Sequence, residues 1–182
     1  MRVMLDACVL YPTVMREVLL GCAAAGLYEP RWTPRILEEW ARATVKLGPG
    51  AETIARGEIA SLAARFPKAM IEEKQGVAIR LWLPDPDDIH VLAAAIGGSC
   101  DAIVTMNASD FPRNVLAEEG LERLDPDNFV LSLRAVDSAA VDAVALAVLT
   151  EARRLSSEPW TMRGLMKKAR LPRLGKALSE LG

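Results

Sequence analysis

The sequence predicts an α/β fold: a three-layer α/β/α domain around a mostly parallel central sheet, followed by C-terminal helices. Short apolar runs alternate with helical patterns over the first two thirds of the chain, and acidic residues follow those runs. Such alternation is typical of parallel sheets whose two faces are covered by helices. Strand signals cease after about Asp127, so we expect one domain over residues 1–127 and a helical extension over residues 128–182.

Strands are expected at three places. Residues 2–5 form a short apolar run that ends at Asp6, and residues 102–105 form another that ends at Thr105. Continuous apolar runs of this length are typical of buried parallel strands. Residues 77–83 alternate in polarity and predict a further strand, which a proline-containing turn ends.

Helices are expected between these runs and after them. Residues 14–23 repeat apolar side chains at helical spacing, and Thr33 followed by Pro34 is typical of a helix start. The helix from Pro34 is expected to pair as a hairpin with one over residues 51–65. Further helices are expected from Asp87 or Asp88 to Ile96, from Pro112, from Ala135 to Leu155, and in two shorter basic segments through Gly182.

Composition bounds the class of protein. A hydrophobic share of 51% and a charged share of 25% are those of a globular protein. No stretch approaches the roughly 20 apolar residues of a membrane-spanning helix, so we expect a cytoplasmic protein without a membrane partner. Three widely spaced cysteines, Cys8, Cys22 and Cys100, predict neither a disulfide framework nor a structural zinc site.

The net charge of −2 hides an asymmetry along the chain. Residues 1–150 hold 14 Lys and Arg against 21 Asp and Glu, whereas residues 151–182 hold 8 against 3. Acidic clusters in the first part could bind metal, and the basic tail could meet a polyanion such as RNA or an acidic partner segment. Simple solvation of a helix surface is the alternative for the tail.

Acidic residues gather where strands end and helices begin. The candidates are Asp6, Glu38 or Glu39, Asp88 with Asp85 and Asp87 nearby, Asp101, Asn107 and Asp110. Parallel sheets bind ligands beyond the carboxyl ends of their strands, so we expect these side chains to share one cleft. Hard divalent cations prefer oxygen ligands, and one or two of them can supply the activated water and charge relief that phosphodiester hydrolysis needs.

Some of these acids have a simpler role open to them. Asp87 and Asp88 could cap a helix, and Asp101 could end a turn. We favour such a structural role for Asp85, Asp87 and Asp101. Asp6 differs, because an aspartate that closes a fully apolar strand gains nothing structural unless it binds something. We therefore expect Asp6 to be functional.

Other site chemistries have less support. A phosphatase with Asp6 as nucleophile would need a second acid two residues later, where the sequence has Cys8. The sequence contains no dinucleotide fingerprint, phosphate-binding loop or nucleophile elbow. The sole histidine, His90, is expected to point away from Asp88 and to have a packing or surface role, since it has no evident partner.

Two blocks of the sequence carry a family resemblance. They read LDACVLYP at residues 5–12 and DPDDIHVLAAAIGGSCDAIVTMNASDFP at residues 85–112. Together they resemble PIN-domain nucleases, particularly the VapC-like toxin branch. The second block is the more specific, because it orders an acid, an alanine-rich helix, a Gly-Gly turn, a short strand ending in threonine, and Asp-Phe. The resemblance covers about residues 1–125, and the helical tail lies outside the common pattern.

The resemblance assigns site residues position by position. It implies catalytic acids at Asp6, Glu39, Asp88 and Asp110, and metal ligands at Asp6, Asp88, Asn107 and Asp110. Asn107 stands where many relatives have aspartate, and it could coordinate a metal through its carbonyl while Asp110 compensates for the lost charge. Thr105 matches a small hydroxyl residue and could hydrogen-bond a ligand carboxylate.

The resemblance also implies an activity and partners. It implies an endoribonuclease that uses Mg²⁺ or Mn²⁺ to cleave single-stranded RNA, is a homodimer, and is the toxin of a type II pair with a cognate antitoxin. A housekeeping RNA-processing nuclease and a non-catalytic PIN-like binding module are the alternatives. The basic tail residues Lys167, Lys168 and Arg170 are expected to contact RNA, or else to solvate a helix or dock an acidic antitoxin segment.

Overall fold

The computed structural model describes residues 1–179, except for the side chain of Gln75, and divides the chain into two compact units. Unit 1 holds residues 1–11 and 29–124, and unit 2 holds residues 12–28 and the chain from residue 125 onward. The last three residues of the predicted extension lie outside the described residues. The expected domain boundary after residue 127 stays a prediction, because a compact unit is not by itself an independently folding domain.

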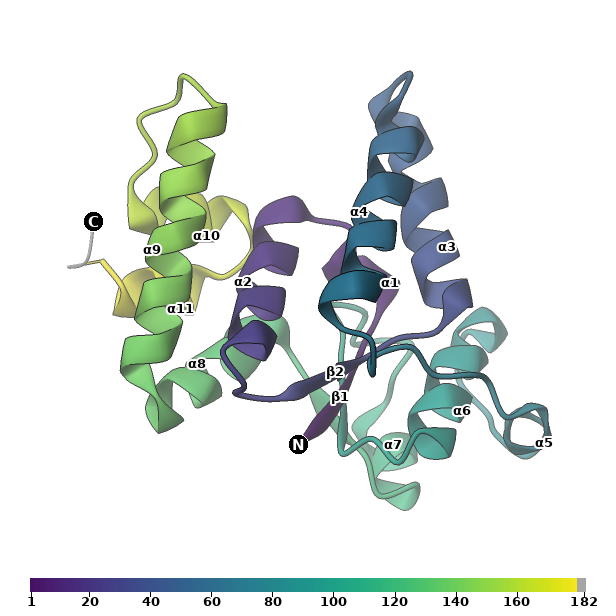
Figure 1. Ribbon diagram of the computed structural model, residues 1–182. Helices are drawn as coiled ribbons and strands as arrows, with labels where there is room; N and C mark the ends of the chain where they lie inside the picture. The colour runs from purple at the N-terminus through teal and green to yellow at the C-terminus, as the bar shows by residue number, and fades with distance from the viewer. Residues whose placement is uncertain (180–182) are drawn as a thin grey trace. The chain divides into compact units, whose positions relative to one another are not determined.

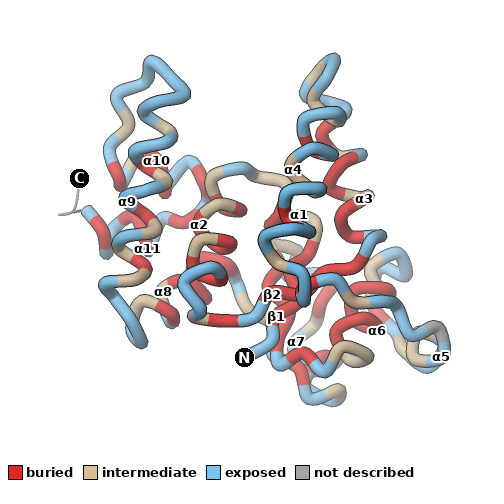
Figure 2. Tube along the Cα trace, in the orientation of Figure 1, coloured by how far each residue is buried: buried red, intermediate tan, exposed pale blue. Residues whose placement is uncertain are grey.

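Unit 1 is built on a four-stranded, all-parallel sheet with strand order β2-β1-β3-β4. Figure 1 labels β1 and β2 of this sheet. The strands are β1 (Arg2–Leu5), β2 (Glu29–Arg31), β3 (Ala102–Val104) and β4 (Glu122–Leu124). The two central strands, β1 and β3, are buried along almost their whole length, as Figure 2 shows for β1. Helices flank this sheet, so the predicted α/β fold class with a parallel central sheet is confirmed.

The register of the central strands decides what lies at the sheet edge. Leu5 of β1 pairs with Val104 of β3, and both are the last residues of their strands. The next residues, Asp6 and Thr105, therefore leave the sheet side by side. The backbone N–H of Asp6 donates to the Val104 carbonyl at 3.2 Å, which continues the ladder to the tip.

The helices of unit 1 cover this sheet and extend from it. They are α1 (Ala7–Leu10), α3 (Pro34–Ala43), α4 (Ala51–Arg65), α5 (Gln75–Ala78), α6 (Ile89–Gly97) and α7 (Arg113–Glu118), with short 3-10 turns η1 (Thr44–Leu47) and η2 (Pro86–Asp88). The start of α3 is as predicted, because Pro34 occupies its first turn and the Thr33 hydroxyl accepts from Ile36 N at 3.2 Å. Helices α3 and α4 pack against each other as the expected hairpin, and α6 packs on β1 and β3.

The strand predicted over residues 77–83 is wrong. The chain forms the short helix α5 there and continues in local turns, for example from Leu81 N to the Ala78 carbonyl at 3.1 Å. Ile79 is 88% exposed and Trp82 is 66% exposed, so the alternating pattern does not mark a buried face. Alternation predicts a strand only where one of the two faces is covered.

Two strands were not predicted from the sequence, β2 and β4. β2 reads Glu-Pro-Arg and β4 reads Glu-Arg-Leu, and both lie at the edges of the sheet. Edge strands tolerate proline and charged side chains, because one side of the strand needs no ladder partner. Their pairing comes from the neighbouring strand rather than from an apolar run of their own.

Unit 2 is helical in its described part. Its helices are α2 (Thr13–Ala24), α8 (Pro126–Val136), α9 (Ser138–Leu155), α10 (Met162–Lys168) and α11 (Pro172–Ala177). The helical run expected from Ala135 is interrupted at Asp137, whose side chain caps α9 by accepting from Ala140 N at 2.9 Å. Helix α2 packs closely on α9, since a Cβ added at Gly21 would lie 2.5 Å from a methyl group of Val144.

A buried aspartate ties the end of unit 2 to α8. The Asp127 carboxylate accepts the backbone N–H groups of Arg173 and Leu174, at 2.8 and 2.9 Å. These N–H groups belong to the first turn of α11, so Asp127 caps that helix from another helix.

Among residues 1–179, no helix combines the length and apolar character needed to cross a membrane.

Candidate functional site

Three aspartates come together at the carboxyl edge of the unit 1 sheet. Carboxylate oxygens of Asp85, Asp88 and Asp110 all lie within 4.8 Å of one another. Asp85 caps the 3-10 turn before α6, Asp88 is the last residue of that turn, and Asp110 comes from the loop after β3. We call these three residues the acid cluster. They are the only group of this kind among the described residues.

The loop that carries Asp110 is fixed by the edge strand β4. Arg123 of β4 donates from one guanidinium nitrogen to the carbonyls of Ala108 and Phe111, at 2.6 and 3.1 Å. Phe111 is fully buried beside Asp110. The loop is therefore anchored on both sides of the acid that it presents.

Asp6 lies at the tip of β1 and is almost fully buried, 6% exposed. The Thr105 hydroxyl donates to Asp6 Oδ2 at 2.6 Å, and Cys8 Sγ donates to the same oxygen at 3.0 Å. Two donors on one oxygen hold the carboxylate in a single orientation. Thr105 thus contacts a predicted ligand carboxylate, although its role in a metal site stays a prediction.

Cys8 has no nucleophilic character in this setting. Burial, followed by the charge of Asp6, raises the pKa of the Cys8 thiol to about 12. The thiolate is the reactive form of cysteine, so Cys8 is held as a neutral donor at neutral pH. Its Sγ also accepts the backbone N–H of Met106 at 3.2 Å, which links the two strand tips.

Asn107 presents its amide to the acid cluster. Its Nδ2 donates to Asp88 Oδ2 at 3.1 Å, while its Oδ1 accepts from the Ser109 hydroxyl at 3.1 Å. In this arrangement the nitrogen of the side chain, rather than its carbonyl oxygen, faces Asp88. Coordination of a metal by the Asn107 carbonyl, which the sequence predicted, would require the amide to turn, and it stays a prediction.

The electrostatics of the acid cluster centre on Asp88. Burial is the main cause that raises the pKa of Asp88 to about 6. The negative charges of Asp6, Asp85 and Asp110 contribute to the same rise, and His90 opposes it. Acids crowded in this way favour either a bound proton or a bound cation. The cluster therefore has the electrostatic character of a cation site.

Glu39 and His90 meet beside this cluster. His90 is 5% exposed, and its Nε2 lies 2.9 Å from Glu39 Oε1 without the alignment of a hydrogen bond. Its Nδ1 lies 3.7 Å from Glu73 Oε1. The expectation that His90 has no partner is wrong, because Glu39, 51 positions earlier in the chain, becomes its neighbour in the fold. The burial of His90 agrees with the expected packing role.

The charge state of Glu39 follows from these neighbours. Burial would raise the pKa of Glu39, but His90 and then Arg35 outweigh it, so the pKa lies below its usual range. Arg35 Nε donates to Glu39 Oε1 at 3.2 Å, the same oxygen that faces His90. Glu39 is thus an ionised carboxylate with one oxygen held.

The neighbouring Glu38 is occupied elsewhere. It forms ion pairs with Arg42 at 2.8 Å and with Arg56 at 2.9 Å, and these arginines hold the pKa of Glu38 at about 2. Of the two glutamates that the sequence left open before the family resemblance, Glu39 is the one that lies beside α6. Its catalytic role stays a prediction.

The structure separates the remaining candidates. Asp101 accepts the backbone N–H of Arg2 at 2.6 Å, and Asp87 is exposed, both in keeping with structural roles. Asp85 has two roles, since its Oδ1 caps η2 by accepting Asp87 N at 2.9 Å while its carboxylate also belongs to the acid cluster. The sequence did contain a signal for it, because residues three apart in a helical turn share one face.

The predicted RNA-contacting residues of the tail belong to unit 2. Lys167, Lys168 and Arg170 are all exposed, and each is free to meet solvent or a partner. Their contact with RNA stays a prediction.

An all-parallel α/β fold with crowded acids beyond the strand ends is typical of proteins that bind a cation or phosphate at that edge. A family model described as PIN domain matches residues 2–109, which is more than half of the chain. The chain therefore belongs to the PIN-domain family. A search of curated proteins and a search of solved structures each found no match.

Family membership places the acid cluster in context. PIN domains are generally nucleases and typically use a divalent metal. The matched region includes Asp6, Glu39 and Asp88, while Asp110 lies one residue beyond it. The chain thus belongs to a family of nucleases, and it carries a cluster of three aspartates that could bind a metal.

Proposed function

We propose that this protein is a metal-dependent endoribonuclease that cleaves phosphodiester bonds in single-stranded RNA. The observation that carries the proposal is the acid cluster, with carboxylate oxygens of Asp85, Asp88 and Asp110 within 4.8 Å of one another in a PIN domain. The raised pKa of Asp88 adds support, because crowded carboxylates without a counter-charge favour a divalent cation.

The donor set fits Mg²⁺ or Mn²⁺. All members of the acid cluster offer carboxylate oxygens, the ligands that these hard cations prefer, and magnesium usually needs only one or two carboxylates besides water and substrate oxygens. Asp6 is close enough to influence the pKa of Asp88 and would complete the set. Such an ion supplies an activated water and offsets negative charge on the phosphate.

The chain's own residues prepare this site. Thr105 and Cys8 hold Asp6 from one side, and the Asn107 amide holds Asp88. Glu39 is kept ionised, so it can bind a cation or accept a proton from a water. We assign His90 as a positioning residue that orients Glu39, because its Nε2 lies 2.9 Å from Glu39 Oε1 and both ring nitrogens are buried without a hydrogen bond in the described residues.

The biological setting is a further part of the proposal. The LDACVLYP block and the block at residues 85–112 resemble the VapC-like branch, which supports a cytoplasmic toxin of a type II toxin-antitoxin pair, with a cognate antitoxin and a homodimeric state. A housekeeping RNA-processing nuclease would have the same site chemistry. A small antitoxin-like reading frame next to the gene favours the toxin, and its absence favours the housekeeping enzyme.

One observation favours a second candidate, a non-catalytic binding module. Asn107 removes a negative charge where many PIN domains have an acid, and its amide nitrogen occupies Asp88 Oδ2. A module of this kind would bind RNA or protein without a metal. Metal-dependent cleavage separates the two functions.

The test of the proposed function uses the full chain and defined RNAs. Unstructured and structured oligonucleotides are incubated with the protein in Mg²⁺, Mn²⁺ or chelator, with the Asp88→Asn variant as the control for a contaminating nuclease. We expect cleavage of the unstructured RNA that needs metal and is lost in the variant. Cleavage that survives chelation, or that the variant retains, would contradict the proposal.

A further inference from the structure

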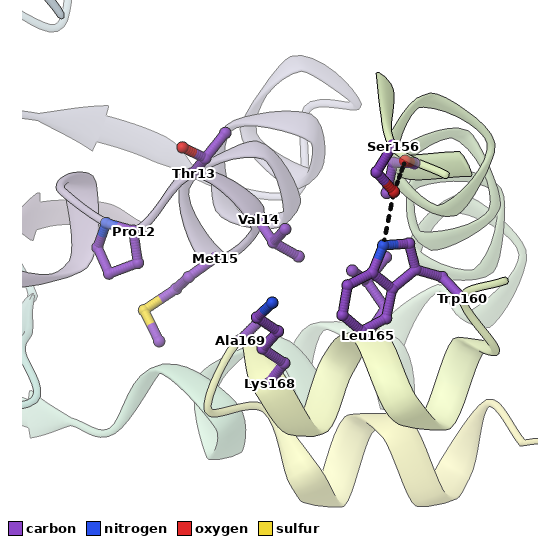
Figure 3. A pocket seen from close by; sticks show the side chains of 10 residues that line it. Pro12, Thr13, Val14, Met15, Ser156, Trp160, Leu165, Lys168 and Ala169 are labelled. Carbon is purple, nitrogen blue, oxygen red and sulfur yellow. Dashed lines mark hydrogen bonds between the residues drawn. The ribbon is translucent and has the colours of Figure 1, made fainter. Parts of the chain in front are cut away.

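Unit 2 contains a pocket of about 320 Å³ that the proposed nuclease site does not use (Figure 3). It lies between the start of α2, the end of α9 and helix α10. Its lining residues are Pro12, Thr13, Val14, Met15, Ala152, Ser156, Trp160, Leu165, Lys168 and Ala169. A volume of this size is at the lower end for small ligands and accommodates one large side chain with its neighbouring backbone.

The interior of the pocket is apolar. Met15, Leu165 and Ala169 are buried, and their side chains line the pocket from α2, from α10 and from the residue that follows α10. The polar group of Trp160 is already satisfied, because its Nε1 donates to the Ser156 hydroxyl at 3.0 Å (Figure 3). A ligand therefore contacts mainly aliphatic carbon there, and burial of an aliphatic side chain in this pocket is energetically favourable.

A positive charge stands at this pocket. Lys168 is exposed, and its Nζ lies 4.7 Å from the centre of the Trp160 ring, an arrangement that holds the cation over the pocket wall. Further exposed cations on or just after α10 are Arg163, Lys167 and Arg170. Arg163 and Lys167 are four residues apart, so they share one face of the helix.

These four cations lack acidic partners within the described residues. Other arginines of unit 2 are paired, for example Arg134 with Asp142 at 2.6 Å and Arg154 with Glu151 at 2.7 Å. No carboxylate in the described part of the chain forms an ion pair with Arg163, Lys167, Lys168 or Arg170. The charge beside the pocket is thus available to a negative partner, whereas that of the other arginines is used inside the unit.

We infer that the pocket binds an acidic peptide segment of a partner protein, with one large aliphatic side chain in the pocket and carboxylates against the four cations. A nucleobase is the poorer guest, because it would bury hydrogen-bonding edges among aliphatic groups. Phosphates alone would engage the cations but leave the apolar space unfilled. The inference concerns unit 2 and does not depend on the nuclease activity.

A selection followed by a binding measurement tests this inference. The full chain is exposed to a random peptide library displayed on phage, and parallel selections use Thr13→Trp and Ala152→Phe, which narrow the pocket from two sides. Circular dichroism and thermal unfolding check that both variants fold. We expect the native chain, but neither variant, to enrich peptides in which acidic residues flank a leucine, isoleucine or methionine.

Synthetic forms of the enriched peptide then separate the two parts of the site. Exchange of the aliphatic residue for alanine should weaken binding by roughly tenfold or more, as expected for loss of one buried side chain. Lys168→Glu should weaken binding by about tenfold, since it replaces attraction by repulsion next to the pocket. Lys176→Glu is the matched control, an exposed lysine on α11 that does not line the pocket, and should change affinity by less than about twofold.

Three results would overturn the inference. In the first, the native chain enriches no peptide family beyond those that the narrowed variants enrich. In the second, the enriched peptides bind equally well after the alanine exchange. In the third, a single-stranded RNA oligonucleotide binds the native chain and binds the narrowed variants more weakly. The last result would assign the pocket to RNA. Its companion measurement is the triple change of Lys167, Lys168 and Arg170 to alanine, which would then lower the log-log salt slope by roughly 0.7 for each lost phosphate contact.

Discussion

The acid cluster of unit 1 and the pocket of unit 2 both hold charge without an opposite charge, and they differ in what surrounds it. In unit 1, Asp88 is half-buried among other carboxylates, and burial with like charge raises its pKa to about 6. In unit 2, Lys168 is exposed beside an apolar hollow, and no acid of the described residues pairs with it.

This difference shows that the neighbourhood of a charge, rather than its sign, indicates the partner. Carboxylates that converge within 4.8 Å leave space for one compact ion and would be crowded by anything larger. Cations spread along a helix beside an aliphatic pocket match an extended, amphipathic partner. The net charge of each part of the chain, which is what the sequence reports, does not separate these cases.

The largest effect is expected at the centre of the acid cluster. Asp88→Asn should reduce RNA cleavage by a factor on the order of a hundred or more, because it removes a metal-binding charge. Initial rates on a fluorescent single-stranded RNA measure the change. Asp87→Asn is the matched control, since Asp87 lies in the same turn but is exposed and outside the cluster. Equal losses in both variants would show that the turn, not the cluster, is responsible.

His90 sharpens the comparison within unit 1. Loss of a group that orients a metal-binding carboxylate typically costs about 10- to 100-fold in metal affinity. We expect that cost for His90→Leu, and we expect His90→Gln to recover most of it, because the glutamine amide nitrogen can occupy the place of Nε2. Manganese binding, followed by its paramagnetic signal, gives the affinities. A glutamine variant as weak as the leucine variant would reduce His90 to a packing residue.

Asn107→Asp tests whether one more negative charge beside the acid cluster strengthens its binding of a divalent cation. Restored charge should tighten Mg²⁺ binding by about severalfold, while the unliganded protein loses stability because a fourth acid then faces Asp88. Titration calorimetry and thermal unfolding without metal measure the two effects. Ser109→Ala is the control, as it removes the partner of Asn107 Oδ1 without a change in charge. Weaker metal binding in Asn107→Asp would contradict the role assigned to this position.

The smallest effect is on stability and depends on pH. The pKa of Asp88 is raised from an ordinary aspartate value near 4 to about 6 in the fold. Ionisation of Asp88 therefore lowers the stability of the folded protein as the pH rises from about 4 to about 6. Asn at this position has no such cost. Without metal, Asp88→Asn should therefore be more stable by about 1 kcal/mol above pH 6, after discount for the exposed half of the side chain, and by nothing near pH 4.

Thermal unfolding across this pH range checks the prediction. A gain of about 1 kcal/mol corresponds to roughly 2–4 °C for a chain of this length. A gain that is the same at both ends of the range would mean that the Asp88 carboxylate does not sense its acidic neighbours.

The sequence sufficed for the parts of the fold that local patterns determine. The apolar runs before Asp6 and through Thr105 predicted the central strands, and parallel pairing then predicted that their tips share an edge. The cap at Thr33 predicted the start of α3. The edge strands were not predicted, because Pro30 and charged residues interrupt the apolar pattern of a strand. The prediction for residues 77–83 was wrong, because alternation of polar and apolar residues does not show whether one face is covered.

The site was harder to predict where it depends on contacts between distant segments. His90 was expected to lack a partner, since nothing nearby in the sequence could be one, yet the fold brings Glu39 to it. Asp85 was expected to have a structural role, and it does cap η2, but its carboxylate also faces Asp88 and Asp110. One side chain can serve both purposes, and local patterns report only the first.

The central claim is that the acid cluster binds a divalent cation through Asp88. Titration calorimetry with Mg²⁺ and Mn²⁺, in buffers of different ionisation heat at about pH 6 and about pH 8, tests it most directly. The account predicts binding at both pH values, release of part of a proton near pH 6 where Asp88 is half protonated, no release near pH 8, and loss of the binding heat in Asp88→Asn. A binding heat that Asp88→Asn leaves unchanged, or no heat in the native protein, would contradict the claim.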